Sequence, residues 1–118
     1  MMRTASRCGP VSPEERAKIL EKIAKAGYMI NDPRFFNPDA HHGSMCPNMF
    51  TSAAYYRLAV AALIPSHPKA KEWFNGALAE LKQEFDDWVD PQGGMAETPH
   101  YSMVILDQWL ASAVIARN

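Results

Sequence analysis

Residues 70–89, AKEWFNGALAELKQEFDDWV, decide the fold class, because they carry the clearest helical pattern in the chain. Apolar residues recur there every three or four positions, which is the spacing of one face of an α-helix. They are Ala70, Trp73, Phe74, Ala77, Leu78, Leu81, Phe85, Trp88 and Val89. Charged and polar residues fill most of the other positions. The stretch therefore predicts an amphipathic outer helix that begins near Ser66-His67-Pro68 and packs through its aromatic side chains.

The segment before it, residues 48–64, is a helix of a different kind. It is apolar on nearly every side, and Arg57 is its one charged residue. Asn48 can cap its start, and Pro65 forbids its continuation. A helix that is apolar all round is covered on all sides by neighbours. We therefore expect this helix to lie in the interior of an assembly.

Two further helices are indicated by their end signals. Ser12-Pro13-Glu14-Glu15 fits a capping box with proline in the first turn, so the first helix is expected to start near Pro13 and to end at Gly27. Thr98-Pro99 is a second such start, and an apolar pattern continues from there to Ile115. No strand pattern occurs, so the prediction is an all-α fold.

About four helices joined by proline- and glycine-rich connections predict two antiparallel α-hairpins in which inner and outer helices alternate. Such hairpins stack into bundles, solenoids or closed α/α barrels. We expect a flexible segment over residues 1–11 and one helical domain over residues 12–118, with a long loop at about 28–47. Two hairpins alone leave apolar surface on the inner helices, so a homo-oligomer is expected, most simply a twofold dimer.

Composition excludes several classes of protein. The chain has 118 residues, with 12 basic and 13 acidic side chains, so it lacks the positive charge that nucleic-acid binding needs. The longest apolar stretch is too short for a membrane span, so no membrane partner is expected. Cys8 and Cys46 form no CxxC spacing and are read as free thiols, and no cofactor is expected. No export signal is recognisable near the start, so localisation is left open.

The segment over residues 90–101 is the most informative one for chemistry. A glycine turn leads there to Glu97, His100 and Tyr101 at the start of the last helix. The positive end of a helix favours an anion, which makes a tyrosine phenolate easier to form. Tyr101 is therefore a candidate acid/base. The alternative is that Thr98 caps the helix and Tyr101 packs in the core.

This segment, together with the helix that starts Asn48-Met-Phe-Thr-Ser-Ala-Ala, resembles the α/α-toroid polysaccharide lyases of the heparinase II/III and alginate lyase type. The resemblance covers roughly residues 41–116, with the amphipathic helix between the two pieces. In that family a D-G-G-x-x-E-x-x-x-Y-like segment follows an outer helix and supplies the catalytic tyrosine. The resemblance implies part of an (α/α) toroid, and it implies a fragment or degenerate relative of such a lyase.

The resemblance also implies roles for individual residues in β-elimination on a uronate-containing polysaccharide. Tyr101 takes the position of the catalytic tyrosine, and Asn48 takes that of the residue that neutralises the uronate carboxylate. Met49 stands where a paired histidine is expected, and His41 and His42 in the preceding loop are placed to reach the same space. The expected partner is thus an anionic polysaccharide. Activity of this chain alone is expected to be weak or absent, because two hairpins form only part of a cleft.

Three charged or polar side chains complete the candidate substrate site: Arg57, Glu97 and His100. Arg57 either meets an anionic sugar or pairs internally with Asp107, since buried charges are normally paired.

Two other functions remain open. In the first, the chain is a non-catalytic helical oligomerisation module. In the second, it binds a metal through His41, His42, Cys46 and His100. The spacing of these four residues matches no strong zinc signature.

Overall fold

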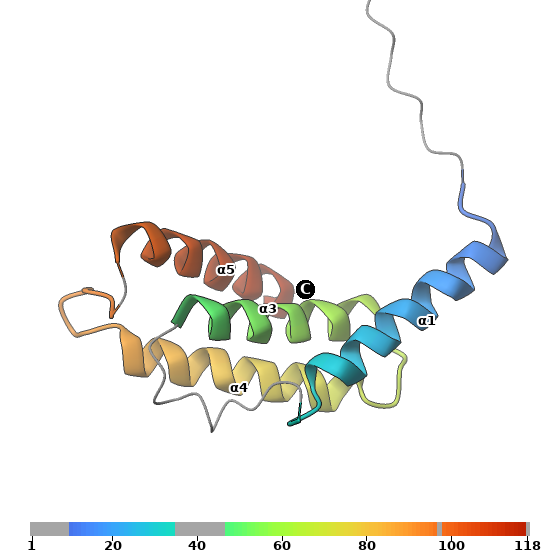
Figure 1. Cartoon of the computed structure of the whole chain (residues 1–118), viewed down its shortest axis with the longest axis horizontal. Helices are drawn as coiled ribbons and strands as arrows, with labels where there is room; N and C mark the ends of the chain where they lie inside the picture. The colour runs from blue at the N-terminus through green and yellow to red at the C-terminus, as the bar shows by residue number, and fades with distance from the viewer. Residues whose placement is uncertain (1–9, 35–46, 97, 118) are drawn as a thin grey trace, which may run out of the picture.

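The computed structural model describes residues 10–34, 47–96 and 98–117, and this part of the chain is all-helical, as predicted (Figure 1). Its helices are α1 (Pro13–Ile30), α3 (Pro47–Leu63), α4 (Ala70–Trp88) and α5 (Pro99–Arg117). Within these residues, pairing of the β type is limited to one isolated antiparallel bridge between Val89 and Met95.

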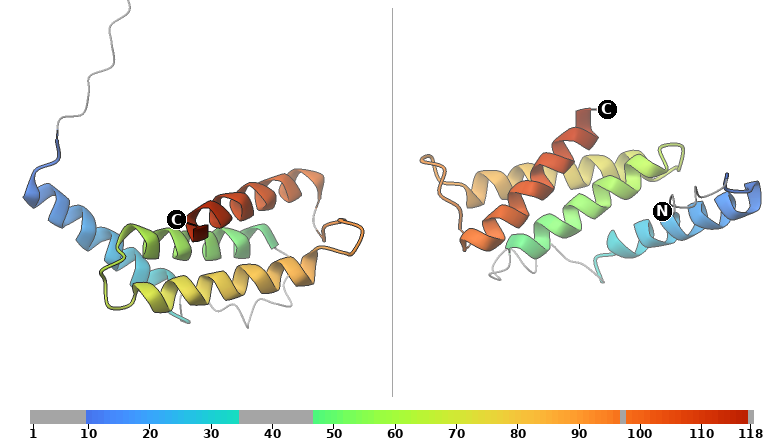
Figure 2. Two further views of the ribbon diagram at one scale, coloured as in Figure 1. Left: turned by 180° about the vertical axis from the view of Figure 1, so that it is seen from behind. Right: turned by 90° about the horizontal axis from the view of Figure 1, so that it is seen from above.

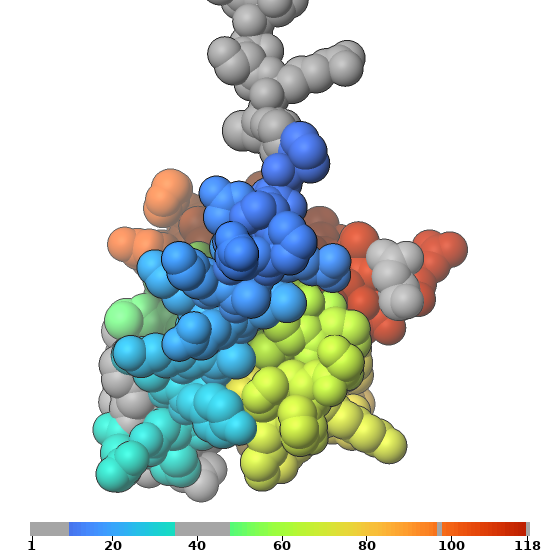
Figure 3. All heavy atoms as spheres, turned by 90° about the vertical axis from the view of Figure 1, so that its right-hand side faces the viewer, coloured from blue at the N-terminus to red at the C-terminus, as the bar shows by residue number. Residues whose placement is uncertain are grey.

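Helix α3 is the central element, because α1, α4 and α5 all pack against it. Helix α4 runs antiparallel to α3, and α5 runs in the same direction as α3 (Figures 1 and 2). The C-terminal half of α1 lies against α3, while its N-terminal half projects away from the other helices (Figure 2). Seen from the side, α1 lies beside the connection between α3 and α4 (Figure 3). Helices α3 and α5 thus form a parallel pair with α4 as the return between them.

The core follows the length of α3. One cluster joins Ala54 and Leu58 to Ala77 and Leu81 of α4, with Trp109 of α5 packed against it. The second cluster lies toward the other end of α3. It consists of Ala61, Ile64 and Trp73, with Ile23, Ala24, Val60 and Phe74 packed against it. Helix α3 is therefore interior, as expected, where α1, α4 and α5 cover it.

The buried stripe of α4 is narrower than the sequence pattern indicated. Leu78 and Phe85 were expected on it, but they are 41% and 50% exposed. The buried residues are Ala70, Trp73, Ala77, Leu81 and Glu84. Because α4 packs mainly along α3 and meets α1 and α5 at the edges of that contact, most of its covered residues lie on a single seam. Phe85 instead contacts the ring of Trp109 on α5, with ring centroids 5.0 Å apart.

The expected end of the first helix at Gly27 is wrong. Helix α1 continues to Ile30, and Gly27 is buried inside it. A Cβ at this position would lie 2.4 Å from Cζ3 of Trp73, so glycine is needed here for close packing of α1 on the core. Asn31 ends the helix instead, since its side-chain amide donates to the Gly27 carbonyl at 2.8 Å. The loop expected from residue 28 therefore begins after the cap.

The other helix ends differ less from prediction. The capping box at Ser12 is present, and α5 begins at Pro99 as expected. Asn48 is not the cap of α3, because that helix already includes Pro47. Helix α4 begins at Ala70 rather than near Ser66, since the residues before it form turns in which His67 accepts from the Ala70 amide at 2.9 Å.

Helix α5 leaves an apolar face uncovered. Its exposed residues are Met103 (64%), Leu106, Leu110 (59%) and Val114 (62%), which recur at helical spacing. Met49, Tyr56 and Leu63 are likewise exposed on α3, seven residues apart, on the side that no other described helix covers. The expectation that both apolar helices leave surface unburied is thus confirmed for the described residues.

Candidate functional site

The N-terminal ends of α3 and α5 lie at the same end of the bundle, because the two helices run in parallel (Figures 1 and 2). Asn48 is in the first turn of α3, and Tyr101 is in the first turn of α5. The Tyr101 side chain is 46% exposed, so the alternative in which it packs in the core is wrong. Its ring meets that of His100 edge-on, with centroids 5.4 Å apart. Two helix N-termini, which favour negative charge, therefore present an amide, an imidazole and a phenol at one end.

A hydrogen bond sets the register of these two helices. The side-chain amide of Gln108 on α5 donates to the Ser52 hydroxyl on α3 at 2.7 Å. The Ser52 hydroxyl in turn donates to the Asn48 carbonyl at 2.7 Å. Both bonds are partly buried, so they hold the first turn of α3 at a fixed height relative to α5.

The turn that leads into α5 is held by its own side chain. Asp90 accepts from the backbone amides of Gln92 at 2.7 Å and Gly94 at 2.9 Å. Gly93 between them has a φ of +86°, which L side chains rarely adopt. The glycines of this segment thus form a tight turn that delivers the chain to Thr98 and Pro99. A shallow hollow of about 430 Å³ runs along this turn beside the C-terminal end of α4.

Several candidate residues lie outside the described part of the chain. They are His41, His42, Cys46 and Glu97. The roles assigned to them in catalysis, substrate binding or metal binding therefore stay predictions. Among the described residues, no group of three or more histidine, cysteine, aspartate or glutamate side chains is arranged to hold a metal ion.

Arg57 is not paired with Asp107, which corrects the internal partner expected from the sequence. Its guanidinium forms an ion pair with Glu80 of α4. It also donates to the side-chain oxygen of Asn31, the cap of α1, at 2.9 Å. Asp107 lies on α5 and is exposed. Arg57 thus ties three helices together, and a sugar would have to compete with these partners for it.

Sequence reasoning missed a buried polar pair beside Arg57. The hydroxyl of Thr51 on α3 donates to Glu84 of α4 at 2.9 Å, and Glu84 is only 1% exposed. Burial raises the pKa of Glu84 to about 8, with Glu80 adding to the rise and Thr51 and Arg57 opposing it. The spacing signal was present, since Glu84 lies three residues after Leu81 and seven after Ala77. A stripe assigned from apolar residues alone passes over this carboxyl group.

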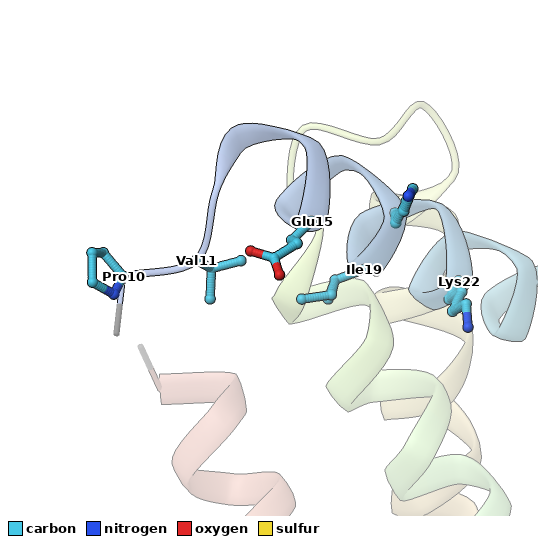
Figure 4. Close-up of a pocket in the computed structure, with 6 residues that line it drawn as sticks. Pro10, Val11, Glu15, Ile19 and Lys22 are labelled. Carbon is cyan, nitrogen blue, oxygen red and sulfur yellow. The ribbon is translucent and has the colours of Figure 1, made fainter. Parts of the chain in front are cut away.

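Another hollow, of about 570 Å³, lies elsewhere (Figure 4). It runs along the projecting half of α1, past Pro10, Val11, Glu15, Lys18, Ile19 and Lys22. It is open and shares no residue with the candidate site. No helix within the described ranges has the length and apolar character needed to cross a membrane.

Comparisons of the chain with protein-family models, with curated proteins and with solved structures give no match.

Proposed function

We propose that this chain is a fragment or degenerate relative of a toroid polysaccharide lyase that acts on uronate-containing polysaccharide by β-elimination. In this proposal Tyr101 is the acid/base and Asn48 faces the uronate carboxylate. His42 assists Asn48, while His41, Glu97 and His100 contact the sugar. Arg57 reaches the sugar only if its ion pair with Glu80 opens. The protein alone is weakly active or inactive.

The observation that carries the proposal is the parallel course of α3 and α5. It places the first turns of both helices, with Asn48 and Tyr101, at one end of the bundle (Figure 1). The helix termini there attract an anionic group, and the half-exposed Tyr101 is accessible to a polymer. A parallel pair of apolar helices with an amphipathic return helix is also the repeating unit that a toroid of alternating inner and outer helices requires.

The chemistry needs one proton to be taken and one to be returned. The group that faces the carboxylate acidifies the proton on the adjacent carbon, and the Tyr101 phenolate removes this proton. The electron pair forms a carbon–carbon double bond as the glycosidic carbon–oxygen bond breaks. The Tyr101 hydroxyl then protonates the leaving oxygen. Such acid/base catalysis contributes roughly 10²–10⁴-fold to a rate.

The test is incubation of concentrated protein with alginate, heparin-like and pectic polysaccharides, without added metal, while the ultraviolet absorbance of the unsaturated product is followed. We expect a slow reaction that falls by at least about 10²-fold in Tyr101→Phe, since only the phenol oxygen is removed. Tyr28→Phe is the matched control, because Tyr28 is 55% exposed on α1 and is also in ring contact with a neighbour.

The outcomes separate the hypotheses. Binding without cleavage indicates a degenerate carbohydrate-binding relative. Cleavage that persists in Tyr101→Phe contradicts the assigned mechanism. Absence of both binding and cleavage contradicts the lyase proposal and favours the second candidate.

The second candidate is a helical oligomerisation module, and the uncovered apolar residues of α5 and α3 favour it. Exposed apolar stripes of this kind are typical of association surfaces. Sedimentation is expected to give a dimer at micromolar concentration, and Leu110→Glu is expected to give a folded monomer, because it places a charge in the middle of the α5 stripe. A wild-type monomer contradicts this candidate.

A further inference from the structure

Glu84 is enclosed between α3 and α4 with little to stabilise a charge. It is 1% exposed, and one of its carboxyl oxygens accepts from Thr51 at 2.9 Å. The other oxygen, Oε1, is buried and has no hydrogen-bond partner among the described residues. An ionised carboxylate in such a site carries a large desolvation cost.

The charges around Glu84 do not compensate for this cost. Arg57 of α3 is the cation that acts on it, but its guanidinium is held by Glu80 and by the Asn31 side chain of α1. Glu80 lies one turn before Glu84 on α4 and repels it when both are ionised. Two carboxyl groups thus share one guanidinium in a buried interface. Glu80 forms the ion pair, so the arrangement favours a proton on Glu84.

We propose that Glu84 is a proton-dependent latch that holds the N-terminal end of α3 against α4 while it is protonated and releases that end when it ionises. The latch acts through the cost of burying the Glu84 charge, which exceeds the gain from the Thr51 hydrogen bond, although that bond by itself favours the ionised form. Thr51 lies one turn after Asn48, so the released segment includes the candidate site. The latch does not depend on the proposed function.

The sign of the pH effect follows from where the proton is held. The pKa of Glu84 is about 8 in the folded protein and close to its ordinary 4.5 in the unfolded chain. Between these values the folded state binds one more proton than the unfolded state, so stability falls as pH rises. The ratio of folded to unfolded protein is expected to fall by up to about tenfold per pH unit across this window, and to become independent of Glu84 above it.

The first experiment measures chemical denaturation of wild type and Glu84→Gln from pH 5 to pH 9, where glutamine keeps the shape of the neutral carboxyl. Wild type is expected to lose stability with pH, whereas Glu84→Gln is expected to be more stable near pH 8 and to have a markedly flatter profile. Equal slopes for the two proteins overturn the proposal. If Glu84→Gln does not fold, NMR titration of the wild-type Glu84 side-chain carbon decides, because a midpoint near 4.5 overturns the latch as well.

A second variant separates the latch from a purely structural role. Glu80→Gln removes the competing carboxylate and frees Arg57 for Glu84, so the Glu84 midpoint is expected to move to lower pH. Glu72→Gln is the matched control on the same helix, because Glu72 is exposed and pairs with Lys69. An unchanged midpoint in Glu80→Gln contradicts the proposed sharing of Arg57.

The opening itself is measured by amide hydrogen exchange corrected for the intrinsic effect of pH. Protection around Thr51 is expected to fall as Glu84 ionises, while protection in the α3 turn around Ala61 changes less, because that turn packs on Trp73 instead. Uniform loss along α3 contradicts a local latch.

Discussion

The two faces of α3 show that burial follows from the number of neighbours rather than from the hydrophobicity of the helix. Helix α4 is rich in charged residues, yet it buries Trp73, Leu81 and even a carboxyl group against α3. Helix α5 has only Asp107 and Arg117 as charged residues, yet its described buried residues are Ile105 and Ser112. The closed face, between α3 and α4, is buried within one chain. The open face, formed by the exposed stripes of α3 and α5, leaves apolar side chains in contact with solvent, as association surfaces do before a partner binds.

The largest expected difference between the faces is in the cost of truncating a leucine. Leu58 is fully buried at the closed face, so Leu58→Ala is expected to reduce the free energy of unfolding by about 2–5 kcal/mol. Leu110 is 59% exposed at the open face, so Leu110→Ala is expected to change it by less than about 0.5 kcal/mol in dilute solution. Urea denaturation of both variants measures the difference. Equal losses of unfolding free energy in dilute solution would contradict the comparison. A Leu110 effect that grows with protein concentration would identify the open face as an association surface.

A smaller effect is expected where α1 meets the closed face. Gly27→Ala places a methyl group 2.4 Å from the Trp73 ring in the present packing, and overpacking of this kind costs about 1–3 kcal/mol. The gain in helix propensity, roughly 0.5–1 kcal/mol, offsets only part of it. Thermal unfolding together with the near-ultraviolet circular dichroism of the aromatic side chains tests this. An increase in stability would show that α1 is not tightly seated on the core.

The smallest effect is expected at the projecting half of α1. The Ser12 hydroxyl accepts from the Glu15 amide at 3.2 Å, and the Glu15 carboxylate accepts from the Ser12 amide at 2.9 Å. Loss of a serine cap costs about 1 kcal/mol. Because this half of α1 projects from the bundle, Ser12→Ala is expected to fray the first turn rather than to unfold the protein. The pKa of Glu15 is lowered first by the backbone amide of Ser12, which alanine keeps, and then by the Ser12 side chain, so the variant is expected to raise this pKa part of the way toward its ordinary value. An NMR titration of Glu15 that is unchanged in the variant would contradict this.

The fold was predictable from the sequence where local signals act alone. The proline starts of α1 and α5 and the stop at Pro65 are backbone restrictions, and they place the helix ends within a few residues. Gly27 was misread because a helix-ending glycine and a packing glycine look alike until Trp73 is known to lie against it. Leu78 and Phe85 were misassigned because the width of a buried stripe depends on how many helices cover it.

The candidate site was predictable only as two separate pieces. The turn at residues 90–94 and the start of α5 were recognisable from glycine, proline and threonine. The partner of Arg57 was not, because both Asp107 of α5 and Glu80 of α4 are carboxylates that could pair with it, and only the packing of α4 on α3 selects Glu80. Glu84 escaped notice because buried carboxyl groups are rare enough that a pattern of apolar residues passes over them.

The most direct test of the account is NMR titration of the protein with a short oligouronate, followed through backbone amide shifts. The proposed site predicts saturable shifts concentrated in the first turns of α3 and α5, around Asn48 and Tyr101, which weaken when Asn48 is replaced by alanine. Tyr101→Phe is expected to keep this binding and to lose cleavage, since the phenol oxygen acts on the proton rather than on the carboxylate. Shifts confined to α1, or no shifts at millimolar ligand, would contradict the claim that these two helix ends form a uronate site.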